Sequence, residues 1–315
     1  MDSTMRIGII TDAHSNPWGQ EAVLNYLRRE GIDKEHTLDL GDIVGMFPGC
    51  LETVRVSIAE AGRGILGNHD AMLLQYFEDT PQREERIAAL DYNRRDISSS
   101  SDQDKIMAYL QSLPTTMSWD GVTFVHNSPF HTNPYKETDM HHRFGESMRD
   151  PSDKKYDPKT SLLLKLAQHS DQLVIRGHSH SASYMGVPKD LTEATTGCLT
   201  KKPKPREGAV SSRGDIWTVP IDPDHNYVLV AASACGANTM FTPDGKLDYR
   251  PAGMIVEYDP GRQQGEITFF TVMEGYDHQK FVNSVLNDQR WQAPVFEEAR
   301  KQIEHLQRGT LLGDH

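Results

Sequence analysis

Residues 63–70 read RGILGNHD, a stretch in which two apolar residues are followed at once by Gly-Asn-His-Asp. A short buried strand therefore ends in three side chains that can bind metal ions or protons. One interpretation is a tight turn, because Gly and Asn are common turn residues. The other is that Asn68 and His69 are held at the end of a strand to do chemistry, and the rest of the chain decides between the two.

Four other short apolar runs also end in polar side chains that can bind metals. The runs cover residues 7–10, 38–40, 122–125 and 173–175, and they lead to Asp12 and His14, to Asp42, to His126, and to His178 and His180. Ligand sites in open α/β sheets form just beyond the carboxyl ends of the strands. We therefore expect these side chains and Asn68 to share one rim.

The spacing within two of these motifs indicates that both side chains of each motif point to the same place. Asp12 and His14 are two residues apart, as are His178 and His180. Residues two apart in an extended segment point to the same side. Each motif alone has an ordinary explanation, because Gly-Asp is normally a turn and close histidines also occur on surfaces. Five motifs in this order, each at a predicted strand end, favour a metal site.

The apolar patterning predicts an α/β fold. Expected strands cover 6–10, 36–40, 65–66, 122–125, 173–175, 227–232, 253–258 and 266–272, and expected helices cover 16–31, 51–61, 83–93, 102–113, 161–168 and parts of 278–306. Strands alternate with helices in the first half, which is typical of α/β proteins. The closely spaced later strands suggest a second sheet packed on the first.

Composition limits the class of protein. The chain has 315 residues, of which 37% are hydrophobic and 25% charged, a balance typical of soluble globular proteins. It shows no apolar run long enough to cross a bilayer, and no secretory signal is expected. Its three cysteines, Cys50, Cys198 and Cys235, form no disulfide or zinc pattern, so a cytoplasmic location is expected.

The formal net charge of −12 bears on partners. A strongly acidic chain repels a long nucleic-acid backbone unless a local patch or bound metal reverses the sign. We therefore expect a small substrate, with neither long nucleic acid nor membrane as a partner.

The motifs Asp12-Ala13-His14, Gly41-Asp42, Gly67-Asn68-His69-Asp70, His126 and Gly177-His178-Ser179-His180 together resemble those of the calcineurin-like metallophosphoesterases. The resemblance covers about residues 5–182, and more loosely 227–290. It is strongest to the compact bacterial branch that includes small phosphodiesterases and dinucleoside-tetraphosphate hydrolases. It implies an α/β fold of two packed mixed β-sheets flanked by helices, a four-layer α-β-β-α sandwich, in a single domain over 1–315.

The chain departs from the family pattern in several places. Asn127 stands where the branch usually has Gly, and residues 232–238 replace the family's Asn-Pro-Gly-Ser type of turn. The segment 184–226 is longer than expected and is predicted to be a cap insertion, and 275–315 is predicted to be a helical extension. These departures leave the expected ligands intact and bear on substrate choice.

The resemblance implies a centre with two divalent transition metal ions. Asp12, His14, Asp42 and His180 would hold one ion, and Asp42, Asn68, His126 and His178 the other, with Asp42 as the bridge. Mixed imidazole and carboxylate ligands suit Mn, Fe, Zn, Ni or Co, of which Mn is favoured. Since only two of the seven ligands are anionic, the ions and a bridging hydroxide leave about one positive charge, which suits a phosphate.

The implied chemistry is phosphoester hydrolysis. A metal-bridging hydroxide would attack phosphorus. His69, beside the ligand Asn68, would assist the leaving group as a general acid or hydrogen-bond donor. Asp70 is expected to orient His69, as carboxylates behind catalytic imidazoles do.

A basic cluster within 184–226 is the candidate for substrate binding; it comprises Lys201, Lys202, Lys204 and Arg206. An exposed flexible loop is the alternative interpretation. His131, His141 and His142 follow no predicted strand, so they are not expected to bind metal.

The sequence favours a phosphodiesterase or phosphatase that acts on a small nucleotide or related phosphate. Dinucleoside polyphosphate hydrolysis is the alternative. A non-catalytic protein-binding scaffold of the same fold is disfavoured, because all seven ligand positions and His69 are competent. The natural substrate, the preference for monoesters or diesters, the native metal and the oligomeric state stay open.

Overall fold

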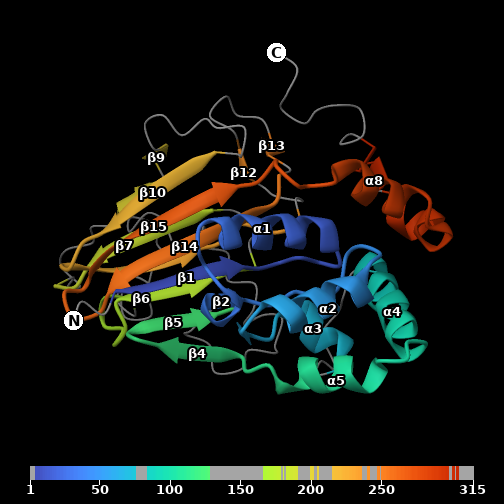
Figure 1. Cartoon of the computed structure of the whole chain (residues 1–315), viewed down its shortest axis with the longest axis horizontal. Helices are drawn as coiled ribbons and strands as arrows, with labels where there is room; N and C mark the ends of the chain where they lie inside the picture. The colour runs from blue at the N-terminus through green and yellow to red at the C-terminus, as the bar shows by residue number, and fades with distance from the viewer. Residues whose placement is uncertain are drawn as a thin grey trace, which may run out of the picture.

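The computed structural model describes residues 4–75, 84–127, 166–178, 180, 182–190, 199–201, 204–205, 215–235, 240–241, 247–248, 250–297, 300–301 and 303–304. Two β-sheets form its centre (Figure 1). The seven-stranded sheet has the order β3-β2-β1-β14-β15-β10-β9, and the six-stranded sheet has the order β4-β5-β6-β11-β7-β8. A separate pair joins β12 and β13.

The strands are short, as the brief apolar runs of the sequence predict. Their bounds are β1 Met5–Ile10, β2 Thr37–Asp39, β3 Arg63–Gly64, β4 Thr116–Trp119, β5 Val122–Val125, β6 Leu173–Arg176, β7 Ser183–Pro188, β8 Leu199–Lys201, β9 Lys204–Pro205, β10 Ile216–Ile221, β11 His225–Val230, β12 Met240–Phe241, β13 Leu247–Asp248, β14 Ala252–Asp259 and β15 Gln264–Thr271.

Both sheets are mixed. In the larger sheet, β1 runs parallel to β2, with Ile9 beside Leu38, and antiparallel to β14. In the smaller sheet, β6 lies parallel to both β5 and β11, while β11 and β7 are antiparallel. The α/β class with two packed mixed sheets flanked by helices is thus confirmed.

The main core lies between the two sheets. Alternate residues of the strands point into it, and Phe124 from β5, Ile175 from β6 and Phe269 from β15 are fully buried there. A second apolar layer joins helix α1 to the outer face of the larger sheet, where Val23 and Leu27 pack with Phe270. Burial on both faces explains why these strands are continuous apolar runs.

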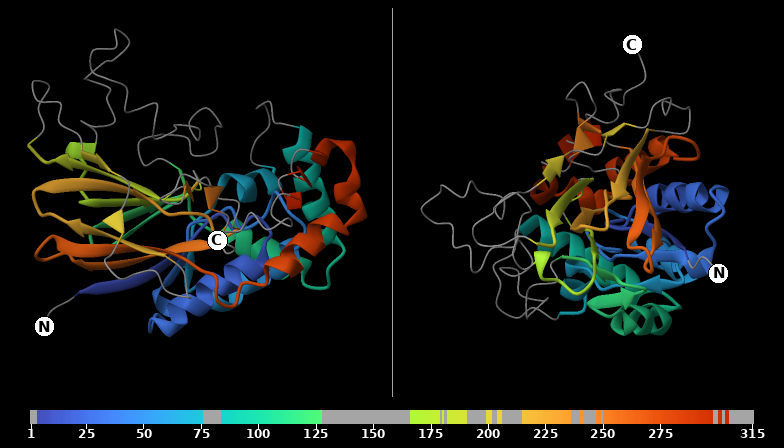
Figure 2. Two further views of the ribbon diagram at one scale, coloured as in Figure 1. Left: turned by 90° about the horizontal axis from the view of Figure 1, so that it is seen from above. Right: turned by 90° about the vertical axis from the view of Figure 1, so that its left-hand side faces the viewer.

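The helices gather largely at one end of the sheets, the end to which β1, β5 and β6 point (Figures 1 and 2). They are α1 Pro17–Arg29, α2 Cys50–Glu60, α3 Asn68–Leu73, α4 Glu84–Ser98, α5 Gln103–Ser112 and α8 His278–Leu286. Helix α1 begins as predicted, with Asn16 accepting a hydrogen bond from the Gly19 amide and Pro17 in the first turn. Within the described residues, no helix is long and apolar enough to span a bilayer.

One expected strand is wrong. Residues 65–66 were predicted as a strand, but β3 ends at Gly64, because the Leu66 amide donates to Pro114 O outside the sheet. Residues 68–73 form helix α3, a helix of six residues that gives no clear periodicity in the sequence.

The described part of the range 184–226 belongs to the sheets. Strand β10 pairs with β15 over six residues, and β7 pairs with β11. Residues 191–198, 202–203 and 206–214 lie outside the described residues, so a cap formed by them stays a prediction. The described part of 275–315 contains α8, which packs against α1 and in an aromatic cluster with Phe47 and Trp291.

Candidate metal centre

All seven candidate metal ligands lie together beyond the carboxyl ends of five strands, β1, β2, β3, β5 and β6. Asp12 and His14 follow β1, Asp42 follows β2, Asn68 begins α3, His126 follows β5, and His178 and His180 follow β6. The first five are buried, whereas His178 and His180 are partly exposed. The centre therefore draws on both sheets and meets solvent on the side of the last two histidines.

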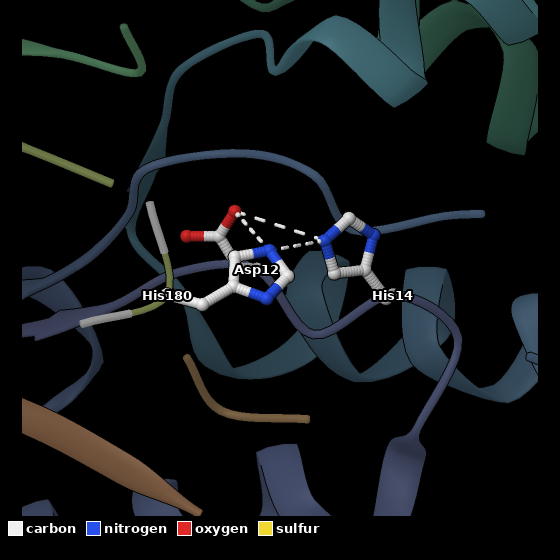
Figure 3. A group of neighbouring side chains, drawn as sticks. All are labelled: Asp12, His14 and His180. Carbon is white, nitrogen blue, oxygen red and sulfur yellow. Dashed lines mark hydrogen bonds and ion pairs between the residues drawn. The ribbon is translucent and has the colours of Figure 1, made fainter. Parts of the chain in front are cut away.

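The first group consists of Asp12, His14 and His180 (Figure 3). The two histidine Nε2 atoms are 2.8 Å apart, and His180 Nε2 lies 3.3 Å from Asp12 Oδ1. His14 Nε2 lies 3.8 Å from the same oxygen. Three potential ligand atoms thus converge on one point.

The second group consists of Asp42, His126 and His178, with Asn68 beside them. Asn68 Oδ1 lies 3.2 Å from His126 Nε2 and 2.8 Å from His178 Nδ1. Asp42 Oδ2 lies 3.2 Å from His126 Nε2.

Asp42 stands between the two groups. Its Oδ1 accepts a hydrogen bond of 2.7 Å from the His69 amide at the start of α3. Its Oδ2 lies 3.7 Å from His14 Nε2 of the first group, as well as near His126 of the second. One oxygen is thus anchored by the helix while the other faces both groups.

Several of these residues adopt left-handed backbone conformations, which non-glycine residues rarely adopt. The φ angles are 54° for Asp12, 46° for His14, 54° for Asp42, 70° for His178 and 55° for His180. Such strain persists only where the surroundings enforce it, and it concentrates at functional sites. Here the Asp12 amide bonds to Gly41 O and the His14 amide to Asp42 O, so the two loops hold each other.

Two ligand candidates are oriented by neighbouring groups. His126 Nδ1 lies 2.7 Å from Leu40 O, which directs Nε2 toward Asp42 and Asn68. Asp12 Oδ2 accepts hydrogen bonds from Thr11 Oγ1 and from the His178 amide, which leaves Oδ1 facing the histidines. Such outer contacts are typical of metal-binding histidines and carboxylates.

The structure assigns Asp70 a different part from the one predicted. Its carboxylate was expected to orient His69, but it accepts four backbone N–H groups, those of Asp42, Ile43, Val44 and Gly67. Burial and the charge of Asp42 raise the pKa of Asp70 to about 7, although these amide donors partly oppose that change. Asp70 therefore holds the turn that carries Asp42.

His69 lies beside the first group, its ring edge-on to His14 with the centroids 4.6 Å apart. Its Nδ1 is buried and has no hydrogen-bond partner among the described residues. This atom rests against Gly45, where a Cβ would lie 2.2 Å from Nδ1. Burial lowers the pKa of His69 to about 4, so its imidazole is neutral at pH 7.

The electrostatics of the centre fit bound cations. Burial opposes ionisation of Asp12 and Asp42, yet the surrounding histidines hold the pKa of both below the ordinary range. Burial also lowers the pKa of His14 and His178 well below its usual value, and a metal-binding histidine must be neutral. Asp12 Oδ1 is buried and has no hydrogen-bond partner among the described residues. The imidazole, carboxylate and amide donors match a transition metal.

Two supporting residues escaped the sequence analysis. Asp39 is buried, accepts the Gly41 amide and Ser57 Oγ, and has its pKa raised by burial to about 7. Asn93 of α4 accepts the Gly45 amide at 2.8 Å and Ser15 Oγ. Both contact the backbone or a hydroxyl of the ligand loops, and such contacts leave no motif in a sequence.

The predicted basic cluster is not tested. Lys202 and Arg206 lie outside the described residues, and only the backbones of Lys201 and Lys204 are described, in β8 and β9. His131, His141 and His142 also lie outside them.

The comparisons with known proteins agree with this geometry. The profile of the calcineurin-like phosphoesterase superfamily domain matches residues 5–210, more than half of the chain. A metallophosphoesterase from Sphaerobacter thermophilus has a similar structure, with a TM-score of 0.61 at 22% identity, covering 96% of this chain and 99% of that one. This likeness shows the fold. No curated protein sequence matches the chain.

A more distant structure is described as "a putative diadenosine tetraphosphatase". It matches with a TM-score of 0.38 at 14% identity, over 85% of this chain and 95% of that one. At that TM-score the match carries no argument about fold or substrate.

Proposed function

The chain belongs to the calcineurin-like phosphoesterase superfamily, and from this premise we propose that it hydrolyses phosphoesters with two divalent transition metal ions, Mn favoured. The substrate class we propose is a small phosphorylated, nucleotide-like molecule, taken as a phosphodiester or a phosphomonoester. The membership itself makes the protein a metal-dependent hydrolase.

The observation that carries the proposal is the position of Asp42 between two groups of ligand atoms. One group comprises Asp12, His14 and His180, and the other Asn68, His126 and His178. Asp42 Oδ2 faces both groups at 3.7 Å and 3.2 Å from their nearest histidine nitrogens. A carboxylate in this position is suited to bridge two ions.

The ions, when bound, would supply an activated water and offset the charge of the phosphoryl oxygens. The protein's own part is to hold the ligand residues in left-handed backbone conformations and to exclude water from most of the centre. His69, beside His14 and neutral at neutral pH, can donate a hydrogen bond to a leaving-group oxygen. Because α3 begins at Asn68, the same turn places a ligand and this donor side by side.

The test combines metal content with turnover. Protein reconstituted with Mn should bind two ions per chain and hydrolyse at least one member of a panel of aryl phosphates, cyclic nucleotides and dinucleoside polyphosphates. Asp42→Asn is the most informative variant. Asparagine tolerates the left-handed backbone conformation at residue 42, so the variant loses only the negative charge. We expect both metal content and activity to collapse in it.

Saturation of the native protein at a single ion would contradict the two-ion proposal. A metal-loaded protein that is inactive on the whole panel would contradict the substrate class.

A further inference from the structure

Arg176 is the last residue of β6, two positions before His178. Leu173 and Ile175 of this strand point into the core between the sheets, so Arg176 lies on the outer face of its sheet. Its neighbours in register are Val125 on β5 and Val230 on β11. Arg176 is nonetheless buried, with only 4% of its surface exposed.

Two donor atoms of the Arg176 guanidinium lack a partner within the described part of the chain. Its Nε and Nη2 atoms are buried and make no hydrogen bond to any described residue, and no ion pair joins Arg176 to those residues. These two atoms form the side edge of the guanidinium, which can bind two oxygens of one oxyanion at once. Arg55 shows that contact in the same protein, because its Nε and Nη2 each lie 2.8 Å from an oxygen of Asp102.

An empty donor edge in a buried position is unfavourable. A charged group without a partner loses its hydration and gains nothing in exchange, so buried charges are normally paired. An arginine guanidinium keeps its proton at neutral pH, so the side chain carries a positive charge. The valines on either side offer no compensating charge. The structure thus keeps a cation and a bidentate donor ready for an anion.

This cation lies close to the metal centre. It ends β6 two residues before His178, a candidate ligand of the second group, and the His178 amide donates a hydrogen bond to Asp12 Oδ2 of the first group. Gly177, the residue between Arg176 and His178, packs so tightly on the Asp12 loop that an added Cβ would lie 2.1 Å from Thr11 Oγ1. An anion bound by Arg176 would therefore be a near neighbour of an anion bound at the centre.

We infer that Arg176 binds a phosphoryl group of the substrate other than the one that is cleaved. The inference rests on the proposed function and narrows its substrate class to molecules with two or more linked phosphates, such as nucleoside polyphosphates. The planar donor fork of arginine matches the oxygens of a phosphate, and lysine does not reproduce it.

Kinetics with two kinds of substrate test this assignment. Arg176→Met removes the charge at similar length, and Arg176→Lys keeps the charge but loses the fork. We expect Arg176→Met to raise the KM for a dinucleoside tetraphosphate, relative to that for nitrophenyl phosphate, by roughly 10- to 100-fold, the usual loss for a charge-assisted hydrogen bond. Arg176→Lys should lie between this variant and the native protein.

Arg55→Met is the matched control. It loses the same kind of donor edge, but its partner Asp102 is on the protein surface, and we expect no change in the KM ratio. A proportional change for both substrates in Arg176→Met would overturn the inference, since it would indicate a general effect on the centre.

Binding and stability give readouts that need no turnover. Calorimetry of the Mn-loaded protein should show imidodiphosphate binding that weakens in Arg176→Met by the same factor, while binding of inorganic phosphate changes little. Arg176→Met should also be at least as heat-stable as the native protein without ligand, because it removes an unpaired buried charge. A marked loss of stability would show that Arg176 pairs with an acidic group of the protein and would overturn the inference.

These readouts also separate the inference from the proposed function. Hydrolysis of one-phosphate substrates together with an unchanged imidodiphosphate affinity in Arg176→Met would refute only the role of Arg176. Inactivity on every substrate would refute the proposed function, and the calorimetry would still decide whether Arg176 binds the second phosphoryl group.

Discussion

The carboxylate of Asp70 holds the backbone of Asp42 in place. Asp70 Oδ2 accepts the Asp42 amide at 2.9 Å, and Oδ1 accepts the amides of Ile43 and Val44 at 3.0 and 3.1 Å. Gly67, just before the ligand Asn68, donates to the same carboxylate. A single side chain of α3 therefore ties together the two loops that carry Asp42 and Asn68.

Replacing Asp70 should affect metal binding more than leaving-group chemistry. Asp70→Ala leaves four buried amides without an acceptor, which should cost about 3–5 kcal/mol of stability and weaken metal affinity. Urea unfolding and metal titration measure the two effects, and Asp104→Asn, at an exposed position of α5, is a neutral control. If Asp70 instead acted mainly on the His69 ring, metal affinity would be kept and only the leaving-group dependence would change.

His69→Ala should retain the metals and slow turnover. We expect a loss of roughly 10²–10⁴-fold with poor leaving groups, because a donor to the leaving oxygen is absent. With nitrophenol the loss should be smaller, since that group departs without help. Since burial lowers the pKa of His69 to about 4, its contribution should persist from pH 5.5 to pH 8. An equal loss with both kinds of leaving group would contradict the donor role.

Gly45 offers an indirect way to move His69. A Cβ at residue 45 would lie 2.2 Å from His69 Nδ1, and the φ of 116° adds strain. Gly45→Ala should therefore reproduce the leaving-group dependence of His69→Ala. Gly275→Ala is the matched control, because its φ is also positive, at 80°, but nothing lies within 4 Å of the added Cβ. Kinetics with good and poor leaving groups compare the two, and native turnover of poor leaving groups by Gly45→Ala would refute the close contact between residue 45 and His69.

His126 should make the metal-free protein less stable as the pH rises from 7 to 9. Burial opposes protonation of His126, but the nearby charges of Asp42 and Asp12 raise its pKa to about 9. In the unfolded chain histidine loses its proton near pH 6.5. The stability from the folded imidazolium is thus complete below about pH 6.5 and is lost as the pH rises toward 9, by about 1.4 kcal/mol per pH unit.

Thermal unfolding of chelator-treated protein at several pH values measures this slope. His126→Gln should remove it, because glutamine does not titrate. Metal binding at pH 7.5 should also release a proton, which calorimetry in two buffers detects. A flat stability profile between pH 7 and pH 9 in the native metal-free protein would show that Asp42 does not hold His126 in its charged form.

The sequence was most informative where strands end. Short apolar runs followed by Asp, Asn or His marked the loops of the centre. Residues that directly follow the carboxyl ends of parallel strands lie at the same edge of a sheet. The sequence could not show that Asp70 bonds to backbone amides. Almost every residue has such an amide, so the type of the donor residue does not reveal the bond. The carboxylate beside a histidine in the chain therefore suggested the wrong contact.

Sheet order was also beyond the sequence. Strands β14 and β15, which are consecutive in the chain, form a hairpin, but β14 also pairs with β1 at the other end of the sequence. The apolar sequences of β1 and β14 do not show which strand each of them pairs with. Asp39, the last residue of β2, and Asn93 of α4 were missed because they accept hydrogen bonds from backbone amides and hydroxyl groups, and such contacts form no motif in a sequence.

The pairing of β1 with β14 has a consequence for how the protein is made. The loop after β1 is completed by residues 233–235, where Ser233 Oγ and the Cys235 amide bond to Asp12 O and the Ala234 amide to Thr11 O. At translation speeds of about 5–20 residues per second, roughly 10–50 s separate the synthesis of Asp12 from that of β14. During that interval the nascent chain carries the acidic side chains of the centre without the scaffold that shapes them. The loop of Asp12 is therefore completed late in biosynthesis, and we expect metal binding at this centre to require a nearly finished chain.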